Sequence, residues 1–548
     1  MANGLKNAVM VLVGLLLGFV LFNQSTDTPN TPNSSSQSNQ SVSQTDRTSI
    51  NNDRINAIVT RAMETFNVPG MAVAVISPDR PTPYFKGYGI ANVDTQTPVT
   101  PDTLFGIASH SKAYTTGALA ILVDEGIIKW DDRVQKYIPE FELYDPWVSE
   151  HFTIRDLLTH RSGLPLGAGD LMWWPNPDFS RQDVINGLKH LKPTSQFRTK
   201  YDYDNLLYIV AGEIVTRTSG MSWEDFVTER LFKPLDMTNC YAVRRYIPEG
   251  TDEARPHAVV DGQLVTTFFT KSEPSSSAAS LTCSISDHAK WVQLQLNDGV
   301  LANGDALFSK KQHAEMWKPV TLRGVSNSMR ERINMQLNAY GLGWGVSNYH
   351  EQLMIQHSGG LQGMVTLTTL LPDTDTAVIV FTNRMLGGPM RAITYQILEE
   401  MFGYKNQNGD HHDWIAFYDN AAKASAQRAA ATIKNAAPKA AAPKPASTDL
   451  AAVIGTYRDP WYGDIHVRAG DDGKTRIIFS KTPVLVGDLS HHDGDTYIAT
   501  WDDRSLFADA YLTLKVSDGT VVSATMKAVS PETDFSYDFH HLNLSKVE

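Results

Sequence analysis

The stretch Phe105-Gly-Ile-Ala-Ser-His-Ser-Lys-Ala-Tyr-Thr-Thr116 constrains the fold more than any other part of the chain. It places Ser109 three residues before Lys112, and the apolar run that follows predicts a helix that begins at Ser109 and is capped by Gly126. Residues three apart share one helical face, so the Lys112 ammonium can reach the Ser109 hydroxyl. A serine hydroxyl needs such a neighbour to become a nucleophile, and a helix N-terminus offers N–H donors to an oxyanion. An ordinary capped helix with an exposed lysine would show the same residues, so this motif needs support from elsewhere.

Size and charge limit the classes of function. The chain has 548 residues and 42% hydrophobic content, which suffices for one large domain and a smaller one. A net charge of −12 argues against a nucleic-acid partner. The only two cysteines, Cys240 and Cys283, exclude a disulfide scaffold; they either pair in an oxidising compartment or remain two free thiols.

The N-terminus predicts export. Residues 1–22, with an apolar run from Ala8 to Phe22 behind Lys6, read as a signal peptide or membrane anchor, and we favour the anchor because no small-x-small cleavage site follows. Residues 23–50 are rich in Ser, Thr, Asn and Gln and predict a disordered tether. Both alternatives place the rest of the chain in the cell envelope, on the periplasmic or extracellular side, with membrane contact only through this segment.

Residues 51–403 predict an α+β domain. A helix ending near Phe66 precedes strands over residues 71–76 and 84–91, and the far end supplies strands over 340–346, 354–360, 364–371 and 376–383 with a closing helix over 392–402. We expect an antiparallel sheet built from both ends of the domain and flanked by helices, with a mainly helical region over 223–320. Residues 165–200, with Trp173 and Trp174, form a loop-rich insertion that either borders a pocket or packs on the surface.

The C-terminal quarter has another composition. Residues 404–448 include an Ala/Lys/Pro-rich stretch and predict a linker. Residues 449–548 alternate short strands with turns and predict a small antiparallel β-barrel, with strands over 464–468, 476–479, 496–500, 511–515, 521–527 and 535–542. Adjacent histidines on a strand face opposite ways, so the pairs at 411–412, 491–492 and 540–541 predict no metal site, and we expect no cofactor.

Two further motifs follow Ser109-x-x-Lys112 along the chain. Tyr203-x-Asn205 precedes a predicted helix, and His357-Ser358-Gly359 lies on a predicted strand. Together, in this order, they resemble the motifs of the penicillin-recognising serine hydrolases, in the class C β-lactamase-like branch with its D-aminopeptidases, DD-peptidases and esterases. Residues 158–165 and 340–344 are also similar to that branch. The resemblance covers about residues 54–402 and implies a β-lactamase-like fold with an all-helical subdomain, while residues 450–548 resemble the lipocalin-like barrel appended to some of these hydrolases.

The resemblance also implies roles for individual residues. Ser109 would be the acylated nucleophile, Lys112 would favour its deprotonation, and Tyr203 would be general base and then acid, with cations stabilising its phenolate. Asn205, together with His357, Ser358 and Gly359, would bind the substrate, Asn205 at the amide side. The backbone N–H groups of Ser109 and Gly360 would form the oxyanion hole.

One departure affects the substrate. Typical β-lactamases and many DD-peptidases have Lys-Thr-Gly where this chain has His357-Ser358-Gly359, and a neutral histidine does not pair with a substrate carboxylate. We therefore predict a serine hydrolase that forms an acyl-enzyme with small peptide, amide or ester substrates, with a peptidase favoured. The alternatives are a promiscuous esterase or β-lactamase and, from another class, a penicillin-binding-like protein that binds without turnover. Peptidoglycan is a candidate partner, and the oligomeric state is not predicted.

Overall fold

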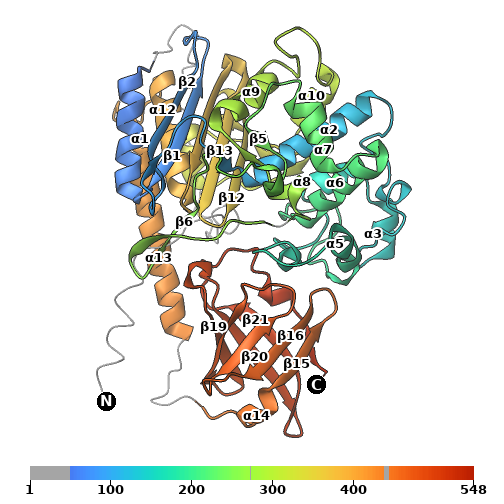
Figure 1. The fold of residues 1–548 in the computed structure, drawn as a ribbon. Helices are drawn as coiled ribbons and strands as arrows, with labels where there is room; N and C mark the ends of the chain where they lie inside the picture. Colours follow the sequence, from blue (N-terminus) through green and yellow to red (C-terminus); the bar gives the residue numbers. More distant parts are fainter. Residues whose placement is uncertain (1–49, 272, 437–443, 548) are drawn as a thin grey trace, which may run out of the picture.

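A computed structural model of the protein describes residues 50–271, 273–436 and 444–547. The apolar run Ala8 to Phe22 and nearly all of the tether predicted over residues 23–50 lie outside this part of the chain. Across the described residues, no helix combines the length and the hydropathy needed to cross a membrane. Figure 1 shows a large body built around a sheet, with a small barrel beneath it.

The central sheet has nine strands, all paired antiparallel, and both ends of the large domain contribute to it. The first strand pairs with the last one of the domain, Val73 opposite Val380. This confirms the expected sheet, whose strands in spatial order are β3 (Thr97–Pro98), β2 (Tyr84–Asn92), β1 (Gly70–Ile76), β14 (Thr376–Thr382), β13 (Met364–Leu371), β12 (Gln352–Leu361), β11 (Gly345–Tyr349), β10 (Asn338–Tyr340) and β9 (Thr321–Leu322).

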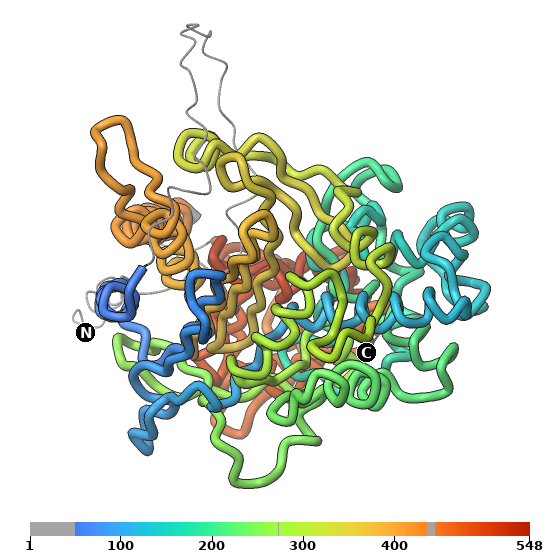
Figure 2. Tube along the Cα trace, turned by 90° about the horizontal axis from the view of Figure 1, so that it is seen from above, coloured from blue at the N-terminus to red at the C-terminus, as the bar shows by residue number. Residues whose placement is uncertain are grey.

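One face of the sheet is covered by helices from the two ends of the domain. β1 is buried at every position, and its alternate side chains Met71, Val73 and Val75 point to this face. They join a core with the helices α1 (Asn52–Phe66) and α12 (Gly387–Phe402). Burial of each such side chain stabilises the fold by about 1.5–3 kcal/mol. Figure 2 shows these blue and orange helices to one side of the strands.

The stretch predicted as a linker contains a long helix, α13 (Trp414–Ala436). Trp414 is fully buried, and its indole N–H donates to Glu399 Oε2 at 3.0 Å. Since Glu399 lies on α12, the start of α13 packs against the large domain.

The opposite face of the sheet carries the helical region. Its elements come from the middle of the chain and are α2 (Ser111–Asp124), α3 (Pro146–His151), α4 (Ile154–Leu158), α5 (Arg181–Gly187), α6 (Leu206–Ser219), α7 (Trp223–Val227), α8 (Ser276–Ala279), α9 (Ile285–Leu296) and α10 (Lys310–Met316). Short strands interrupt them: β4 (Phe105–Gly106), β5 (Cys240–Tyr241), β6 (His257–Val260), β7 (Gln263–Thr266) and β8 (Thr282–Cys283). Residues 223–320 are therefore helical only in part. The helix α11 (Asn327–Ile333) lies with α1 and α12 instead, because its buried Met329 and Ile333 join their core.

The two cysteines form a disulfide. Cys240 of β5 lies directly opposite Cys283 of β8, and β8 pairs on its other side with β4. Of the two alternatives that the sequence left open, paired or free, the structure has the pair. The strand β4 leads directly into the turn that carries Ser109. The disulfide on β8 is therefore one strand away from the strand that precedes Ser109.

The strand predicted over residues 340–346 is not continuous. Tyr340 ends β10 and Gly345 begins β11, and a turn over residues 341–344 joins them, with Gly343 in the left-handed region at φ +78°. A Cβ at Gly343 would lie 2.9 Å from the Lys112 carbonyl oxygen, so this turn packs tightly on the start of α2. Gly341 and Gly343 allow close backbone approaches and lie outside both strands.

The C-terminal domain is a closed antiparallel barrel, as expected. After a short helix, α14 (Leu450–Val453), its eight strands are β15 (Gly455–Asp459), β16 (Gly463–Ala469), β17 (Thr475–Phe479), β18 (Val486–Asp493), β19 (Thr496–Trp501), β20 (Ala510–Ser517), β21 (Thr520–Ala528) and β22 (Leu544–Lys546). β15 pairs with β22, which closes the barrel.

The last predicted strand, over residues 535–542, is also wrong. The segment between β21 and β22 is irregular and holds only a 3-10 turn at Phe539–His541. Its backbone donors go to local turns, as when the Ser536 N–H donates to Asp534 Oδ1 and the Tyr537 N–H to the Asp534 carbonyl oxygen. The alternating aromatic residues favour a strand, but the aspartate capping overrides them.

Candidate active site

Ser109 lies in a sharp turn between β4 and α2. A 3-10 turn, Ala108–His110, precedes α2, so the α-helix proper begins two residues after Ser109. Ala108 adopts a left-handed φ of +51°, unusual for a residue with a Cβ, and such strain is typical of functional sites. Ser109 is 6% exposed.

Lys112 lies directly beside this serine. Its ammonium is fully buried and donates to Ser109 Oγ at 3.0 Å, to Asn205 Oδ1 at 2.8 Å and to the Ala278 carbonyl oxygen at 2.9 Å. Burial lowers the pKa of Lys112 from 10.5 to about 7, although the charges of Asp170 and Asp204 act in the opposite direction. A lysine in this state can exchange a proton with the serine near neutral pH.

Tyr203 and Asn205 come from the loop before α6. Lys112 Nζ lies 4.8 Å from the centre of the Tyr203 ring. Burial raises the pKa of Tyr203 well above 10, so the resting side chain is the neutral phenol. The Asn205 amide is held at both ends, because its Oδ1 accepts from Lys112 and its Nδ2 donates to Asp170 Oδ2 at 2.8 Å.

The His357-Ser358-Gly359 motif lies on β12. It follows Gln356, which is opposite Gly345, the first residue of β11, so the motif has no β11 partner on that side. A Cβ at Gly359 would lie 2.1 Å from the Ile107 carbonyl oxygen, so only glycine lets this part of β12 meet the Ser109 turn. Gly360 follows on the same strand. The three motifs, about 250 residues apart along the chain at their extremes, thus converge on one place.

His357 is neutral in this setting. Its Nε2 is 2.8 Å from the Tyr340 hydroxyl and its Nδ1 2.8 Å from the Ser358 carbonyl oxygen. Burial, with the charges of His110 and Lys112, holds the pKa of His357 well below 6.5. This agrees with the expectation that the motif histidine does not replace the cationic lysine of typical β-lactamases.

A cavity of about 210 Å³ opens beside these residues. Tyr203, His357 and Ser358 line it together with Arg323 and Arg391. Neither arginine makes an ion pair with any carboxylate in the described part of the chain. Asp202 also lines the cavity, but its carboxylate pairs with Lys200 at 3.0 Å. The cavity therefore combines the motif side chains with two arginines that have no ion-pair partner among the described residues.

His160, which belongs to the stretch 158–165, supports the tyrosine from behind. Its Nδ1 accepts from the Asp204 N–H at 3.1 Å, and its ring centre lies 4.2 Å from that of Tyr203. The backbone at His160 has a φ of +52°, so the loop is sharply bent there.

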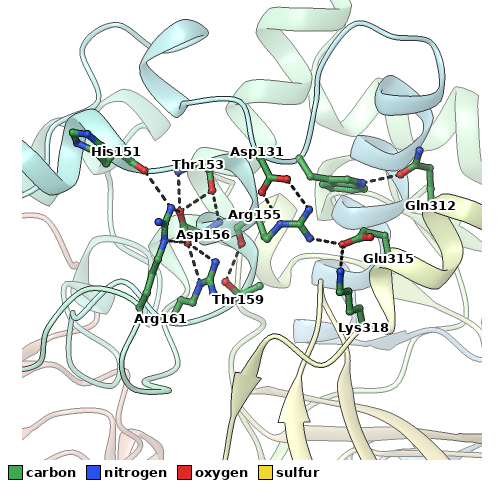
Figure 3. Close-up of polar contacts among 12 residues, drawn as sticks. Asp131, His151, Thr153, Arg155, Asp156, Thr159, Arg161, Gln312, Glu315 and Lys318 are labelled. Carbon is green, nitrogen blue, oxygen red and sulfur yellow. Dashed lines mark hydrogen bonds and ion pairs between the residues drawn. The ribbon is translucent and has the colours of Figure 1, made fainter.

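A buried carboxylate fastens the same loop (Figure 3). Asp156 accepts from the Thr153 N–H at 3.0 Å and pairs with Arg161 at 2.9 Å and with Arg198 at 2.5 Å. Burial disfavours the charged form, but the bonds from Arg198 and Thr153 outweigh it and lower the pKa of Asp156. Asp156 forms a capping box with Thr153, the N-cap residue of α4. It thus ties the start of this helix to Arg161, which directly follows His160, and to the more distant Arg198.

The insertion over residues 165–200 both borders the cavity and packs against the barrel. Leu166 lines the cavity. Trp174 is buried and lies 6.0 Å, centre to centre, from Tyr537 of the barrel domain. Asp170 of the same insertion, which holds Asn205, carries no motif and was missed by the sequence analysis.

The comparisons identify the family. Residues 55–401 match the Beta-lactamase family, and the chain belongs to it. Residues 439–546 match a domain of unknown function (DUF3471). The expected resemblance and the fold class are therefore confirmed.

Several known proteins are similar over most of their length. Unguisins hydrolase ungD of Aspergillus violaceofuscus is 27% identical over 471 residues, which is 81% of this chain and 82% of that protein. Its counterpart ungD' of Aspergillus campestris is 25% identical over 75% of this chain and 76% of its own. Protein flp of Staphylococcus aureus strain N315 is 24% identical, and the match spans 64% of its length.

Solved structures agree on the fold. The octameric penicillin-binding protein homologue from Pyrococcus abyssi superposes with a TM-score of 0.57 at 21% identity, covering 91% of this chain and all of that one. At this identity the similarity establishes the fold, and the chemistry has to come from the side chains described above.

Proposed function

We propose that this protein is a serine hydrolase that acts through an acyl-enzyme intermediate on Ser109. One observation carries the proposal: the fully buried Lys112 Nζ lies 3.0 Å from Ser109 Oγ, and the pKa of Lys112 is about 7. About half of the lysine is then unprotonated at pH 7 and can accept the serine proton. Membership of a family with hydrolase relatives supports the same conclusion.

The reaction follows from these positions. The neutral Lys112 amine takes the hydroxyl proton, and Ser109 Oγ bonds to the substrate carbonyl carbon while one carbonyl electron pair moves to oxygen. The N–H groups of Ser109 and Gly360 hold that oxyanion. Collapse breaks the bond to the leaving amine or alcohol, which receives the proton of the Lys112 ammonium through the Tyr203 hydroxyl. Water then hydrolyses the ester by the same steps.

Tyr203 has a different task from the one that the resemblance implies. A phenolate base is disfavoured because burial raises the pKa of Tyr203 well above 10. Its hydroxyl serves instead as a relay that passes the proton between Lys112 and the leaving group, while Lys112 is the base.

The cavity charge favours peptide substrates that carry an anionic group. Arg323 lies over the rings of Tyr201 and Tyr340, at 5.4 and 5.8 Å from their centres, and so faces the same cavity as His357. A substrate carboxylate could pair with it, where His357 remains neutral. A peptidase acting near a free carboxylate therefore ranks above a promiscuous esterase.

We also propose that the enzyme works in the cell envelope, with small peptides or peptidoglycan fragments as partners. The paired Cys240 and Cys283 support this, since disulfides persist in oxidising compartments. The apolar residues 1–22 would deliver or anchor the chain there.

Intact-mass measurement after a short quench tests the function. The full chain and Ser109→Ala are each exposed to a nitrophenyl ester, a D-aminoacyl amide, a penicillin and a pair of peptides that differ only in a free or amidated C-terminus. We expect an acyl adduct on the wild type alone and faster turnover of the free-acid peptide. An adduct that forms without turnover on every donor would support the binding-protein alternative. An adduct on both proteins, or on neither folded protein, would overturn the proposal.

A further inference from the structure

The segment between β21 and β22 leaves the barrel and enters the large domain. Ser536 Oγ donates to Asp170 Oδ2 at 2.7 Å, and Asp538 Oδ2 accepts from the Gly169 N–H at 2.6 Å. Neither bond lies on the protein surface, because Asp170 and Asp538 are fully buried. The barrel is thus bonded to residues of the insertion that borders the cavity.

Phe535 of the same segment lies beside the motif tyrosine. It lines the cavity, and its ring centre is 6.2 Å from that of Tyr203. A Cβ at Gly167 would lie 2.6 Å from Phe535 Cδ2, and Gly167 has a φ of +68°. Glycine at this position lets the phenylalanine approach the loop whose Gly167 N–H donates to the Tyr203 carbonyl oxygen at 3.0 Å.

Asp170 joins the barrel to the lysine. Its Oδ2 accepts both from Ser536 Oγ at 2.7 Å and from Asn205 Nδ2 at 2.8 Å. The Asn205 Oδ1 at the other end of the amide accepts from Lys112 at 2.8 Å. An amide has one donor end and one acceptor end, so the acceptor at Asp170 selects the orientation in which Asn205 offers oxygen to Lys112. If the amide turned over, its NH₂ would face the ammonium.

We propose that Ser536 and Asp170 are positioning residues of the catalytic site: the barrel supplies the hydroxyl that holds the Asp170 carboxyl, Asp170 orients the Asn205 amide, and Asn205 holds Lys112 against Ser109. The barrel domain is then part of the hydrolase site and not only an appended module. This inference rests on the proposed function, because it concerns the same lysine.

The surroundings of this chain of hydrogen bonds determine how it responds to pH. The titratable groups that act on Asp170 or Lys112 are Asp204 before α6, His160 after α4, His357 on β12, and the phenols Tyr203 and Tyr208. Asp538 of the barrel lies next to them, where it accepts from the Gly169 N–H. Burial raises the pKa of Asp170 well above 3.8, and the Ser536 hydroxyl acts in the opposite direction by favouring the carboxylate, whose negative charge raises the pKa of Lys112. Loss of the Ser536 hydroxyl should therefore lower the pKa of Lys112 as well as loosen it.

The test measures the acylation rate of the full chain against pH for Ser536→Ala, Ser536→Thr and a matched control, Ser530→Ala. Ser530 lies in the same loop, where its Oγ accepts from the Glu532 N–H at 3.1 Å. For Ser536→Ala we expect a plateau rate lowered by roughly fivefold to tenfold, with KM little changed and the acid limb of the profile moved to lower pH. Ser536→Thr should recover most of the rate because it keeps the hydroxyl, and Ser530→Ala should match the wild type.

The outcomes separate this inference from the proposed function. If the wild type forms an adduct and Ser536→Ala matches it in rate and in acid limb, the positioning role is wrong while the hydrolase remains. If the wild type forms no adduct, the function itself fails. Should Ser536→Ala not fold, Ser536→Cys keeps the size with a weaker donor, and an unchanged rate in that variant would equally overturn the inference.

Discussion

The pH dependence of acylation is the sharpest consequence of the structure. With a pKa of about 7, Lys112 is about half neutral at pH 7. A lysine with an ordinary pKa near 10.5 would be neutral in only about 3 of 10,000 molecules, so burial increases the competent fraction about a thousandfold. Below its pKa the neutral fraction falls tenfold per pH unit. We therefore expect kcat/KM at pH 5 to be about 100-fold below its value at pH 9.

The assay is release of nitrophenol from an activated ester under kcat/KM conditions, between pH 5 and 10. The histidines near the site do not explain a fall in kcat/KM around pH 7. Burial lowers the pKa of His110 to about 4 and holds those of His160 and His357 well below 6.5. Asp204 is the competing group, since burial raises its pKa to about 7 as well.

Asp204→Asn separates the two groups. Asp204 Oδ1 accepts from the N–H groups of Leu206 and Leu207, and an asparagine oxygen can keep both bonds. Removing the negative charge should lower the pKa of Lys112 and move the limb to lower pH. If the limb disappears in this variant, Asp204 is the titrating group. A flat profile from pH 5 to 9, or a rise that continues past pH 10, would refute Lys112 as the base.

Three further outcomes follow from named contacts. Tyr203→Phe should lower kcat by about 100- to 10,000-fold through loss of the relay hydroxyl, with an unchanged melting temperature; near-normal kcat would exclude that role. Replacing Cys240 and Cys283 by alanine removes a link between residues 43 apart and should destabilise the fold by about 2–4 kcal/mol, measured by urea unfolding, and an unchanged midpoint would mean that the bridge constrains little. Asp156→Asn should destabilise by about 2–3 kcal/mol at pH 7, because it weakens the pairs with Arg161 and Arg198. Since the pKa of Asp156 is lowered, its contribution is present above about pH 4 and is lost as the pH falls through the folded value, so wild type and variant should converge in acid; a constant difference down to pH 2 would contradict this.

Local sequence determined the elements that depend on neighbours in the chain. A glycine cap predicts the end of the helix α6, which is followed by Gly220 with a φ of +74°. Hydrophobic periodicity predicts the strand β13, whose observed bounds are the predicted ones. The three-residue spacing likewise places Lys112 beside Ser109, because a helical turn brings them together wherever the helix lies. The motif order was enough to expect the β-lactamase-like fold.

Tertiary structure decided whatever depends on chain segments far apart. Asp170 and Ser536 are 366 residues apart and have no spacing signal, yet they share a hydrogen bond. The strand predicted over residues 535–542 fails partly for the same reason. Asp534 caps a local turn through the Ser536 N–H, and Asp538 accepts from the distant Gly169 N–H of the large domain. The pKa of Lys112 also depends on burial by several elements at once. Spacing therefore determined which side chains could react, whereas packing determined their protonation and the part that the barrel plays in holding them.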